Sequence, residues 1–357
     1  MLVLVISYTF KLIIFLNKKS IKSFVVTSCG TMTSVIREDG GIVEFCDVKS
    51  KNPLFLPQRI LALRKIFKQI EPDIIHVRSR IPAWLTFFAK RGLRVPIVST
   101  VHGINSVNPY SRIMTNADHV ICVGKPVKTH IQEHYRTEDS KITIIPRGVD
   151  TMYFDPSEVN YSQINNLKKK YSLNGKFIVG CIGRISPMKD YETIISAISR
   201  TIQRIPNVKG LFIGGPRSPN DKYAESLMKN SFDKCGDSIV WAEPTSKVRE
   251  FYSCCDLVVN ASPVMCNVAR TILEGIAMNK PVLSTEFNNL ERIIQNGRNG
   301  FYFKTQDPDD LSDKILRLHD QRLRNIRDTI PREFTLTDMV ESTIKVYQNL
   351  LKTNIAE

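Results

Sequence analysis

A cationic turn at residues 183–189 is the segment whose residue types point most directly to chemistry. It reads Gly-Arg-Ile-Ser-Pro-Met-Lys, follows an apolar run over 177–182, and precedes a helical pattern that starts near Asp190. Backbone amides, the positive end of a helix and the side chains of Arg184 and Lys189 together suit a diphosphate. A loop arginine alone is usually solvated, so Lys189 and the strand-turn-helix setting carry the phosphate interpretation.

Glu274 is a second candidate binding residue. An apolar run over 257–260 ends at Asn260, a loop follows, and a helical pattern over 271–278 carries Glu274. In dinucleotide-binding folds, an acidic side chain in such a setting accepts hydrogen bonds from ribose hydroxyls. Taken alone, a glutamate in the position of Glu274 is more commonly an ordinary charge on a helix surface.

The N-terminal half carries a histidine and two arginines at the end of another apolar run, 74–77. His76 either lines a ligand cleft or is a structural histidine at a strand terminus. Arg78 and Arg80 either meet an anionic acceptor or are solvated loop cations. Asp307 and Asp309 have the D-x-D spacing of some metal sites, but they stand just before a helical pattern. We therefore predict a helix cap there and no metal site.

The elements that position these residues alternate along the chain. Short β-branched runs read as strands that are buried on both faces of a parallel sheet, and helical spacing such as Ile60, Leu63, Phe67 and Ile70 lies between them. This alternation predicts an α/β protein with two facing, doubly wound domains, which bind ligands at the carboxyl ends of their strands. The predicted strands are 23–27, 42–45, 74–77, 97–101, 120–123, 142–145, 177–182, 209–213, 238–241, 257–260 and 281–284; the helices of the second half are 191–204, 223–234, 246–254, 271–278 and 311–324.

Domain boundaries follow from turn signals around 153–175, where Asp155-Pro156 and Asn174-Gly175 occur. We predict an N-terminal domain over 1–160, a C-terminal domain over 161–335, and a last helix over 336–357 that packs back on the N-terminal domain. Residues 1–16 are apolar but too short and interrupted for a membrane span, and they lack signal-peptide features. They are interpreted as a buried helix or an irregular first element, with a shallow membrane contact as the alternative.

Composition and charge narrow the class of protein. The chain has 357 residues, of which 42% are apolar and 24% charged, so it is neither disordered, collagen-like nor a coiled coil. Its formal charge is +15; residues 1–150 carry 22 Lys and Arg against 11 Asp and Glu, a net of +11. This excess indicates an anionic partner, either nucleic acid, a membrane surface or a phosphorylated substrate, unless it reflects a lysine-rich genome. Eight cysteines without a C-x-x-C pair indicate free thiols in a reducing cytoplasm.

Several of these segments, taken in chain order, resemble glycosyltransferase family 4, the retaining GT-B group. The set spans residues 72–303. Residues 79–84 and Arg270 also resemble a bacterial branch that builds surface polysaccharide or lipopolysaccharide. The matching segments are Pro72-Asp-Ile-Ile-His76, Ser99-Thr-Val-His102-Gly103, Ile144-Ile-Pro-Arg-Gly-Val-Asp150, Gly183-Arg184 with Lys189, Leu273-Glu274-Gly-Ile-Ala-Met278, Pro281-Val282 and Asn296-Gly-Arg-Asn-Gly300.

The resemblance implies a set of roles. Arg184 and Lys189 would hold the nucleotide diphosphate and stabilise the leaving phosphate, and Glu274 would bind the donor ribose. His102 would reach the donor sugar from the opposite domain. The base would lie near 241–245, transfer would proceed with retention, and no metal would be needed, as in the family. No cofactor would be needed either, because the nucleotide-sugar is a substrate. The remaining donor contacts would come from Gly183, Asn267, Val268, Ala269 and Arg270.

Two features depart from the family pattern. Family members carry a glutamate seven residues before the one matched by Glu274, and this chain has Cys266 there. A thiol does not accept sugar-hydroxyl hydrogen bonds as a carboxylate does, which implies an altered donor-sugar site. The family also opens with a strand and a Gly-rich loop, and no glycine precedes Gly30. The first strand and its loop are therefore predicted to be missing.

The resulting prediction is a hexosyltransferase-type enzyme that moves a sugar from a nucleotide-sugar donor to a lipid-linked or polysaccharide acceptor. It would work at the cytoplasmic face of the inner membrane, with the basic N-terminal domain near the acceptor and anionic lipid. Three rivals remain: a degenerate relative that only binds nucleotide, a nucleic-acid-binding protein suggested by charge alone, and another GT-B enzyme such as an epimerase. No nucleic-acid partner is expected from the motifs.

Overall fold

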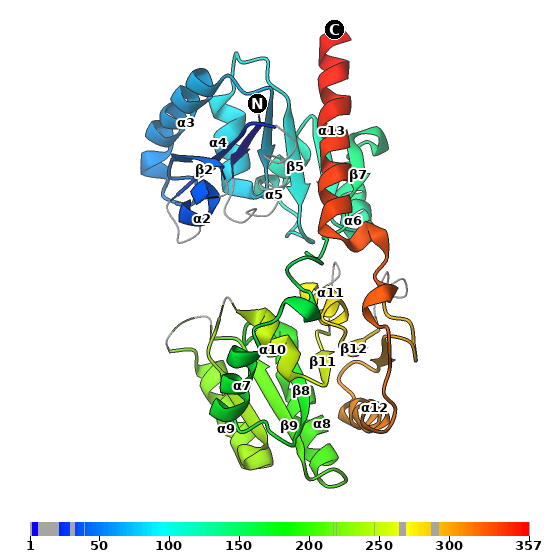
Figure 1. The fold of residues 1–357 in the computed structure, drawn as a ribbon. Helices are drawn as coiled ribbons and strands as arrows, with labels where there is room; N and C mark the ends of the chain where they lie inside the picture. Colours follow the sequence, from blue (N-terminus) through cyan, green and yellow to red (C-terminus); the bar gives the residue numbers. More distant parts are fainter. Residues whose placement is uncertain are drawn as a thin grey trace. The chain divides into compact units, whose positions relative to one another are not determined.

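The computed structural model describes residues 2–5, 21–28, 33–38, 40–216, 218, 220–245, 247–263, 269–286 and 293–356. The chain divides into two compact units, Met1–Pro146 with Thr337–Glu357, and Arg147–Leu336 (Figure 1). Each unit is built on an open sheet in which the strands run parallel. The predicted class, α/β with two doubly wound domains, is confirmed. The predicted division at 160/161 lies 14 residues beyond the observed one, and residues 147–160 belong with the second unit.

The N-terminal sheet has the strand order β3-β2-β1-β4-β5-β6-β7. The chain moves outward from β1 to β3, returns to β4 beside β1, and continues in the other direction. Such a reversal creates a crevice at the carboxyl ends of the two central strands, where ligands bind in this class of fold. The strands are β1 (Leu2–Val5), β2 (Ser23–Thr27), β3 (Ile42–Phe45), β4 (Ile74–Val77), β5 (Ile97–Val101), β6 (His119–Cys122) and β7 (Ile142–Ile144); the helices are α2 (Thr33–Glu38), α3 (Leu56–Ile70), α4 (Arg80–Ala89), α5 (Pro109–Arg112), α6 (Lys125–Tyr135) and α13 (Leu336–Ala356).

The first strand is present, and the prediction that it is missing is wrong. β1 pairs with β2 through Leu2↔Ser23 and with β4 through Leu2↔Ile74, so it lies in the middle of the sheet. The error has a physical cause, because the apolar run does not stop at Val5 but continues toward Leu16, which hides the end of the strand. Residues 6–20, where the loop would follow, lie outside the described residues.

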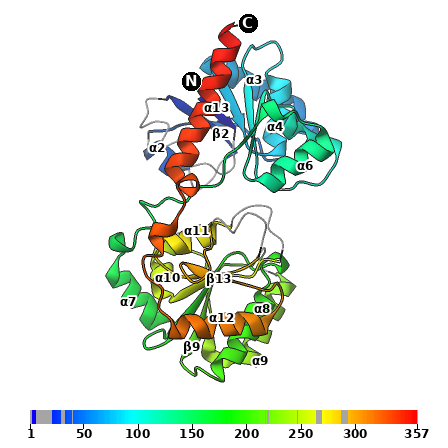
Figure 2. The same ribbon diagram turned by 90° about the vertical axis from the view of Figure 1, so that its right-hand side faces the viewer.

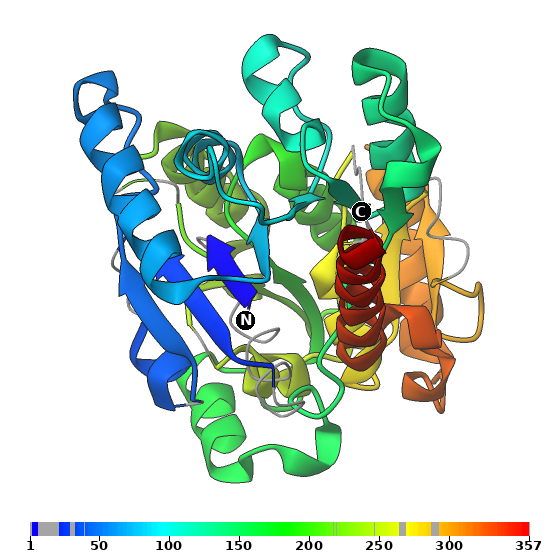
Figure 3. The ribbon, with the colours of Figure 1, turned by 90° about the horizontal axis from the view of Figure 1, so that it is seen from above.

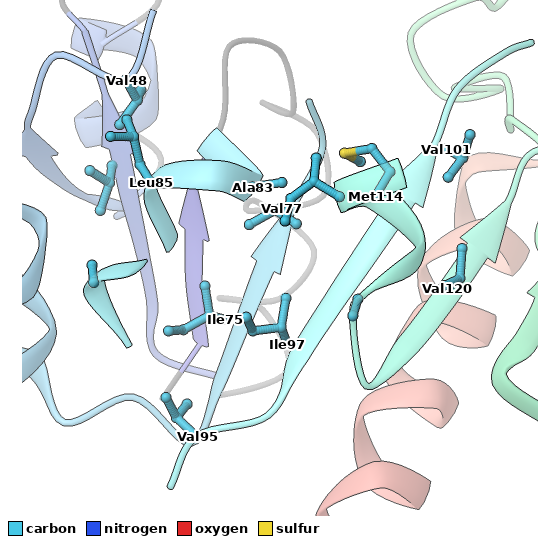
Figure 4. Close-up of a cluster of buried hydrophobic side chains, with 14 of the residues drawn as sticks. Val48, Ile75, Val77, Ala83, Leu85, Val95, Ile97, Val101, Met114 and Val120 are labelled. Atoms are coloured by element: carbon cyan, nitrogen blue, oxygen red, sulfur yellow. The ribbon is translucent and has the colours of Figure 1, made fainter. Parts of the chain in front are cut away.

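The core of the N-terminal unit lies between this sheet and α3, α4 and the segment around Met114. Figure 4 shows Val77, Ala83 and Met114 gathered at one end of it, near Val101. α13 belongs to this unit although it ends the chain, and Figures 2 and 3 show both labelled termini there. No helix in the described part of the chain is both long and apolar enough to cross a membrane.

The second sheet repeats the same order one domain later, β10-β9-β8-β11-β12-β13. Successive residues of β8 face opposite sides, as a strand requires: Ile178 joins a core with α10 and α11, and Val179 one with α8 and α12. The strands are β8 (Phe177–Ile182), β9 (Val208–Ile213), β10 (Ile239–Ala242), β11 (Leu257–Asn260), β12 (Val282–Thr285) and β13 (Gly300–Phe303); the helices are α7 (Tyr161–Lys170), α8 (Tyr191–Ile202), α9 (Lys222–Cys235), α10 (Val248–Cys254), α11 (Arg270–Ala277) and α12 (Pro308–Asp320).

Local signals explain several ends of these elements. The Asp307 carboxylate accepts hydrogen bonds from the backbone N–H groups of Asp309 and Asp310, which confirms the predicted cap of α12. Asp190 caps α8 in the same way through Thr193. The described cysteines are free thiols, and all but Cys235 are buried.

Candidate functional site

The turn after β8 lies at the point where the second sheet reverses its strand order, between β8 and β11. Its backbone is held on both sides. The N–H of Gly183 donates to the Ile213 carbonyl at 2.9 Å, and the buried Tyr191 hydroxyl donates to the Gly183 carbonyl at 2.7 Å. Gly214 passes so close that a Cβ there would lie 1.8 Å from the Gly183 oxygen. The backbone of the turn is therefore held in place at the carboxyl end of β8.

Lys189 is the charged group that this turn directs toward the neighbouring strand. Its Nζ lies 3.5 Å from Oδ1 of Asn260, the last residue of β11. Burial lowers the pKa of Lys189, and the positive charge of Arg270 acts in the same direction. No carboxylate is among the groups that shift this pKa. A half-buried ammonium in such surroundings favours an anionic ligand, which would offset the lost hydration.

Arg184 and Arg270 lie at the solvent edge of the same region. Arg184 is exposed directly after Gly183, and Arg270 is the exposed first residue of α11. The structure thus places Arg184 and Lys189 on one turn and brings Arg270 within electrostatic range of Lys189. Three cations around one strand end form a site that fits phosphate oxygens.

Glu274 is held by a residue that the sequence did not single out. The hydroxyl of Tyr252 on α10 donates to its Oε2 at 2.7 Å. Burial raises the pKa of Tyr252 well above its ordinary value, and the Glu274 charge adds to this, so the phenol stays a donor. Glu274 is half-buried rather than a freely solvated charge. Nothing in the spacing of 22 residues between Tyr252 and Glu274 reveals this hydrogen bond. The contact of Asn260 with Lys189 was equally hidden, because the sequence shows Asn260 only as a polar residue at the end of an apolar strand.

The N-terminal unit has a cavity of about 180 Å³ at the carboxyl ends of β4 and β5. Among the residues that line it, Arg78 donates from Nε to Nε2 of His102 at 3.1 Å, and Arg80 donates to the Ser111 hydroxyl at 3.1 Å. Because a guanidinium only donates, a neutral His102 ring carries its proton on Nδ1. The cavity is lined by Arg78, Ser79, Arg80, Thr100, Val101, His102, Gly103, Asn105 and Met114.

His76 does not line this cavity, which corrects its placement among the acceptor-side residues. It is 1% exposed, and its ring nitrogens lie 2.6 Å from the Tyr347 hydroxyl and 2.7 Å from the Thr100 hydroxyl. Burial, followed by the charge of Arg78, keeps the pKa of His76 well below its ordinary value. This geometry agrees with the alternative interpretation of His76 as a structural histidine.

The remaining predicted residues divide into two groups. Cys266, Asn267 and Val268 lie outside the described residues, while Ala269 is half-buried and directly precedes α11. Near the expected base site, Trp241 packs against Tyr191 and Phe212 and donates its indole N–H to Ser231 at 2.8 Å. Trp241 is therefore committed to the domain core. Within the described ranges, no three His, Cys, Asp or Glu side chains gather as a group that could hold a metal ion.

Comparisons with known proteins agree with this organisation. Residues 7–153 match the family model "Glycosyltransferase Family 4", and residues 176–321 match "Glycosyl transferases group 1". The capsular polysaccharide biosynthesis glycosyltransferase CapM of Staphylococcus aureus is 24% identical over 95% of this chain and 92% of its own length. The chain spans 64–67% of the length of the first three curated relatives that it matches.

Solved structures share the fold along almost the whole chain. A glycosyltransferase from Rickettsia africae has a TM-score of 0.87 at 23% identity, covering 98% of both chains. Anabaena HepE in complex with UDP and glucose has a TM-score of 0.81 at 18% identity, covering 97% of this chain and 98% of its own. The two parallel-sheet domains are thus those of the GT-B fold.

Proposed function

We propose that this chain, which belongs to the glycosyltransferases through its family 4 and group 1 domains, moves a hexosyl group from a nucleotide-sugar to a lipid-linked or polysaccharide acceptor. The proposal includes retention at the anomeric carbon and no need for a metal ion. The observation that carries it is Lys189, half-buried against Asn260 at the strand reversal of the second sheet. The UDP and glucose held by Anabaena HepE support a nucleotide-sugar donor.

Each residue then has a physical task. Lys189 and Arg184 neutralise charge as it builds on the leaving diphosphate, which stabilises the transition state more than the ground state. Glu274, oriented by Tyr252, accepts hydrogen bonds from the ribose hydroxyls. The bond from the anomeric carbon to the phosphate oxygen breaks, and a bond to the acceptor oxygen forms on the same face. The acceptor proton passes to the leaving phosphate.

We also propose that the enzyme works on the cytoplasmic face of the membrane, bound there peripherally through α3. Leu54, Phe55 and Leu61 are 81%, 52% and 65% exposed at and before the first turns of this helix. Lys49, Lys51, Lys65 and Lys68 are exposed around them, and no acidic residue occurs between 48 and 70. Exposed apolar side chains among cations are the pattern of a segment that lies on anionic lipid.

The test of the transferase proposal is a panel of UDP-, GDP- and ADP-hexoses incubated with the full chain, with release of the nucleotide as the readout. We expect turnover of one donor class. Lys189→Ala and Arg184→Ala should each lower kcat by about 10²- to 10³-fold. Lys176→Ala, an exposed cation of the same domain, serves as the matched control. Equal turnover in all variants would remove the site assignment.

The presence of Cys266 at the position of a family glutamate favours a second candidate, a relative that binds nucleotide without turning it over. Calorimetry would distinguish the two. Nucleotide binding without turnover in the wild type, with turnover restored in Cys266→Glu, would identify a decayed enzyme. Turnover in the wild type would exclude this candidate.

A further inference from the structure

The cavity of the N-terminal unit is lined by both cationic and apolar side chains. Its polar side is cationic, since Arg78 and Arg80 line it together with His102, and no Asp or Glu is among the lining residues. Part of its lining is apolar, since Val101 and Met114 line it and also belong to the buried core, where Figure 4 labels both. A site with this lining attracts an anion of modest size.

An apolar rim, defined here as Ile104, Val107 and Tyr110, adjoins the cavity. These side chains are 53%, 54% and 41% exposed, and none belongs to the core of the unit. Ile104 stands between Gly103 and Asn105, which line the cavity, and the Tyr110 ring lies 5.3 Å from the guanidinium carbon of Arg80. The rim is therefore continuous with the cationic wall.

The loop that carries the rim is held in place by its backbone rather than by its apolar side chains. The Asn105 carbonyl lies 3.0 Å from His130 Nε2, and the Tyr135 hydroxyl donates to the Ser106 carbonyl at 3.3 Å. Trp84 donates its indole N–H to the Tyr110 carbonyl at 3.0 Å. Polar contacts thus fix the loop while Ile104 and Val107 remain in water, which costs free energy unless a ligand covers them.

We propose that this cavity and rim bind the acceptor as an anionic lipid: a phosphate or diphosphate group lies against Arg80 and Arg78, and its hydrocarbon chain lies on the rim. The inference rests on the proposed transferase function and specifies its acceptor. Charge complementarity selects the phosphate, and the exposed apolar side chains beside it select a lipid-borne phosphate over a free one. A neutral polysaccharide acceptor would use neither feature.

Calorimetric titration of the full chain tests the proposal, in the presence of saturating UDP so that the donor site is occupied. The probes are farnesyl phosphate, farnesol and inorganic phosphate, each kept below the concentration at which it aggregates. Farnesyl phosphate should bind at least tenfold more tightly than either of the others, since only it engages both features. Equal binding of farnesyl phosphate and inorganic phosphate, or of farnesyl phosphate and farnesol, would overturn the proposal.

Two sets of variants separate the features. Arg80→Gln should weaken farnesyl phosphate binding about tenfold, the usual scale for a lost charge-assisted hydrogen bond, and leave farnesol unchanged. Arg80→Lys, which keeps the charge, should retain most of the affinity, whereas a purely structural role of Arg80 predicts equal losses. Ile104→Ser with Val107→Ser should weaken farnesyl phosphate but not inorganic phosphate. Arg94→Gln and Phe232→Ser, exposed residues elsewhere, are the matched controls.

Failure of this inference is distinguishable from failure of the transferase proposal. Binding of UDP and turnover of a nucleotide-sugar are measured on the same preparation without any lipid. A protein that turns over donor but does not prefer farnesyl phosphate contradicts the acceptor assignment alone. A protein that binds farnesyl phosphate selectively yet neither binds UDP nor consumes any donor contradicts the transferase function and leaves the lipid site.

Discussion

Glu274 shows how much a residue's meaning depends on its neighbours. From the sequence it was either a ribose ligand or a solvated helix charge. In the structure one of its oxygens accepts a hydrogen bond from the buried Tyr252 hydroxyl. Burial of a phenol beside a carboxylate removes water from both groups, which costs free energy. Packing of the ring alone would not require the hydroxyl. The arrangement therefore favours a role in holding Glu274 in a defined direction.

Replacement of Tyr252 by phenylalanine tests this role. The ring volume stays, and one hydrogen bond to a charged group, about 1.5–3 kcal/mol, is lost. We expect the KM for the nucleotide-sugar to rise about tenfold or more with kcat little changed. In a Glu274→Ala background the same change should have no further effect. Tyr161→Phe, at a 69% exposed tyrosine, is the control, and equal effects of Tyr252→Phe in both backgrounds would contradict the coupling.

The residue types of the candidate donor site were predictable, but their partners were not. Arg184 and Lys189 stand in one continuous segment whose strand-turn-helix setting is visible in the sequence. The contact between Lys189 and Asn260 joins residues 71 positions apart, and only the strand order places β8 beside β11. The buried position of His76 was hidden for a related reason, because its partner Tyr347 is 271 residues away in the sequence.

At the scale of elements, the strands with clear ends were predicted and two others were not. β1 merges into a longer apolar run, so no turn residue marks where it stops. β13 begins at Gly300, which was noted only as part of a family motif. The structure shows why this position requires glycine, because a Cβ there would lie 1.9 Å from the Val282 carbonyl oxygen of the neighbouring strand.

α3 and the residues just before it carry the membrane proposal, and their exposed side chains can be altered without touching the core. Leu54→Ser with Leu61→Ser removes apolar contact, and Lys65→Gln with Lys68→Gln removes charge. Each pair should lower co-sedimentation with vesicles of 70% phosphatidylcholine and 30% phosphatidylserine several-fold, since each basic residue near such a surface contributes about 1 kcal/mol. Lys222→Gln with Lys229→Gln on α9 is the control. Wild-type protein that binds neutral and anionic vesicles equally would contradict the charge argument.

At the scale of the whole molecule, the chain leaves its first unit at Pro146 and returns to it at Thr337. The segment after Pro146 is fastened to the second unit: Gly148 has no room for a Cβ, which would lie 2.2 Å from the Thr335 oxygen, and Val149 exchanges backbone hydrogen bonds with Phe334 and Leu336. The Arg327 side chain also binds the Thr151 and Phe154 carbonyls. These contacts explain why turn residues near 155 do not mark the division between units.

The C-terminal helix α13 packs in the first unit, where its Tyr347 hydroxyl lies against the buried His76 ring. This contact makes the free energy of unfolding depend on pH. His76 lies between the Thr100 and Tyr347 hydroxyls, with Arg78 nearby. Its pKa is far below the unfolded value near 6.5, so the unfolded chain takes up a proton that the folded chain does not as the pH falls below 6.5. Stability is therefore fully present above pH 6.5 and decreases below it, by at most about 1.4 kcal/mol per pH unit.

Thermal melting at pH 7.0, 6.0 and 5.0 measures this effect in the range in which histidines titrate, above the ordinary pKa values of carboxylates. The melting temperature of the wild type should fall by about 2–4 °C for each kcal/mol lost. His119, whose pKa is also lowered by burial, contributes in the same direction. His76→Gln should melt lower at pH 7.0 because its hydrogen bonds are altered, yet show a shallower decline toward pH 5.0. His319→Gln, at the surface of α12, should keep the wild-type slope. If His76→Gln declined as steeply as the wild type, the buried contact between the first unit and its returning helix would not be the origin of the acid sensitivity.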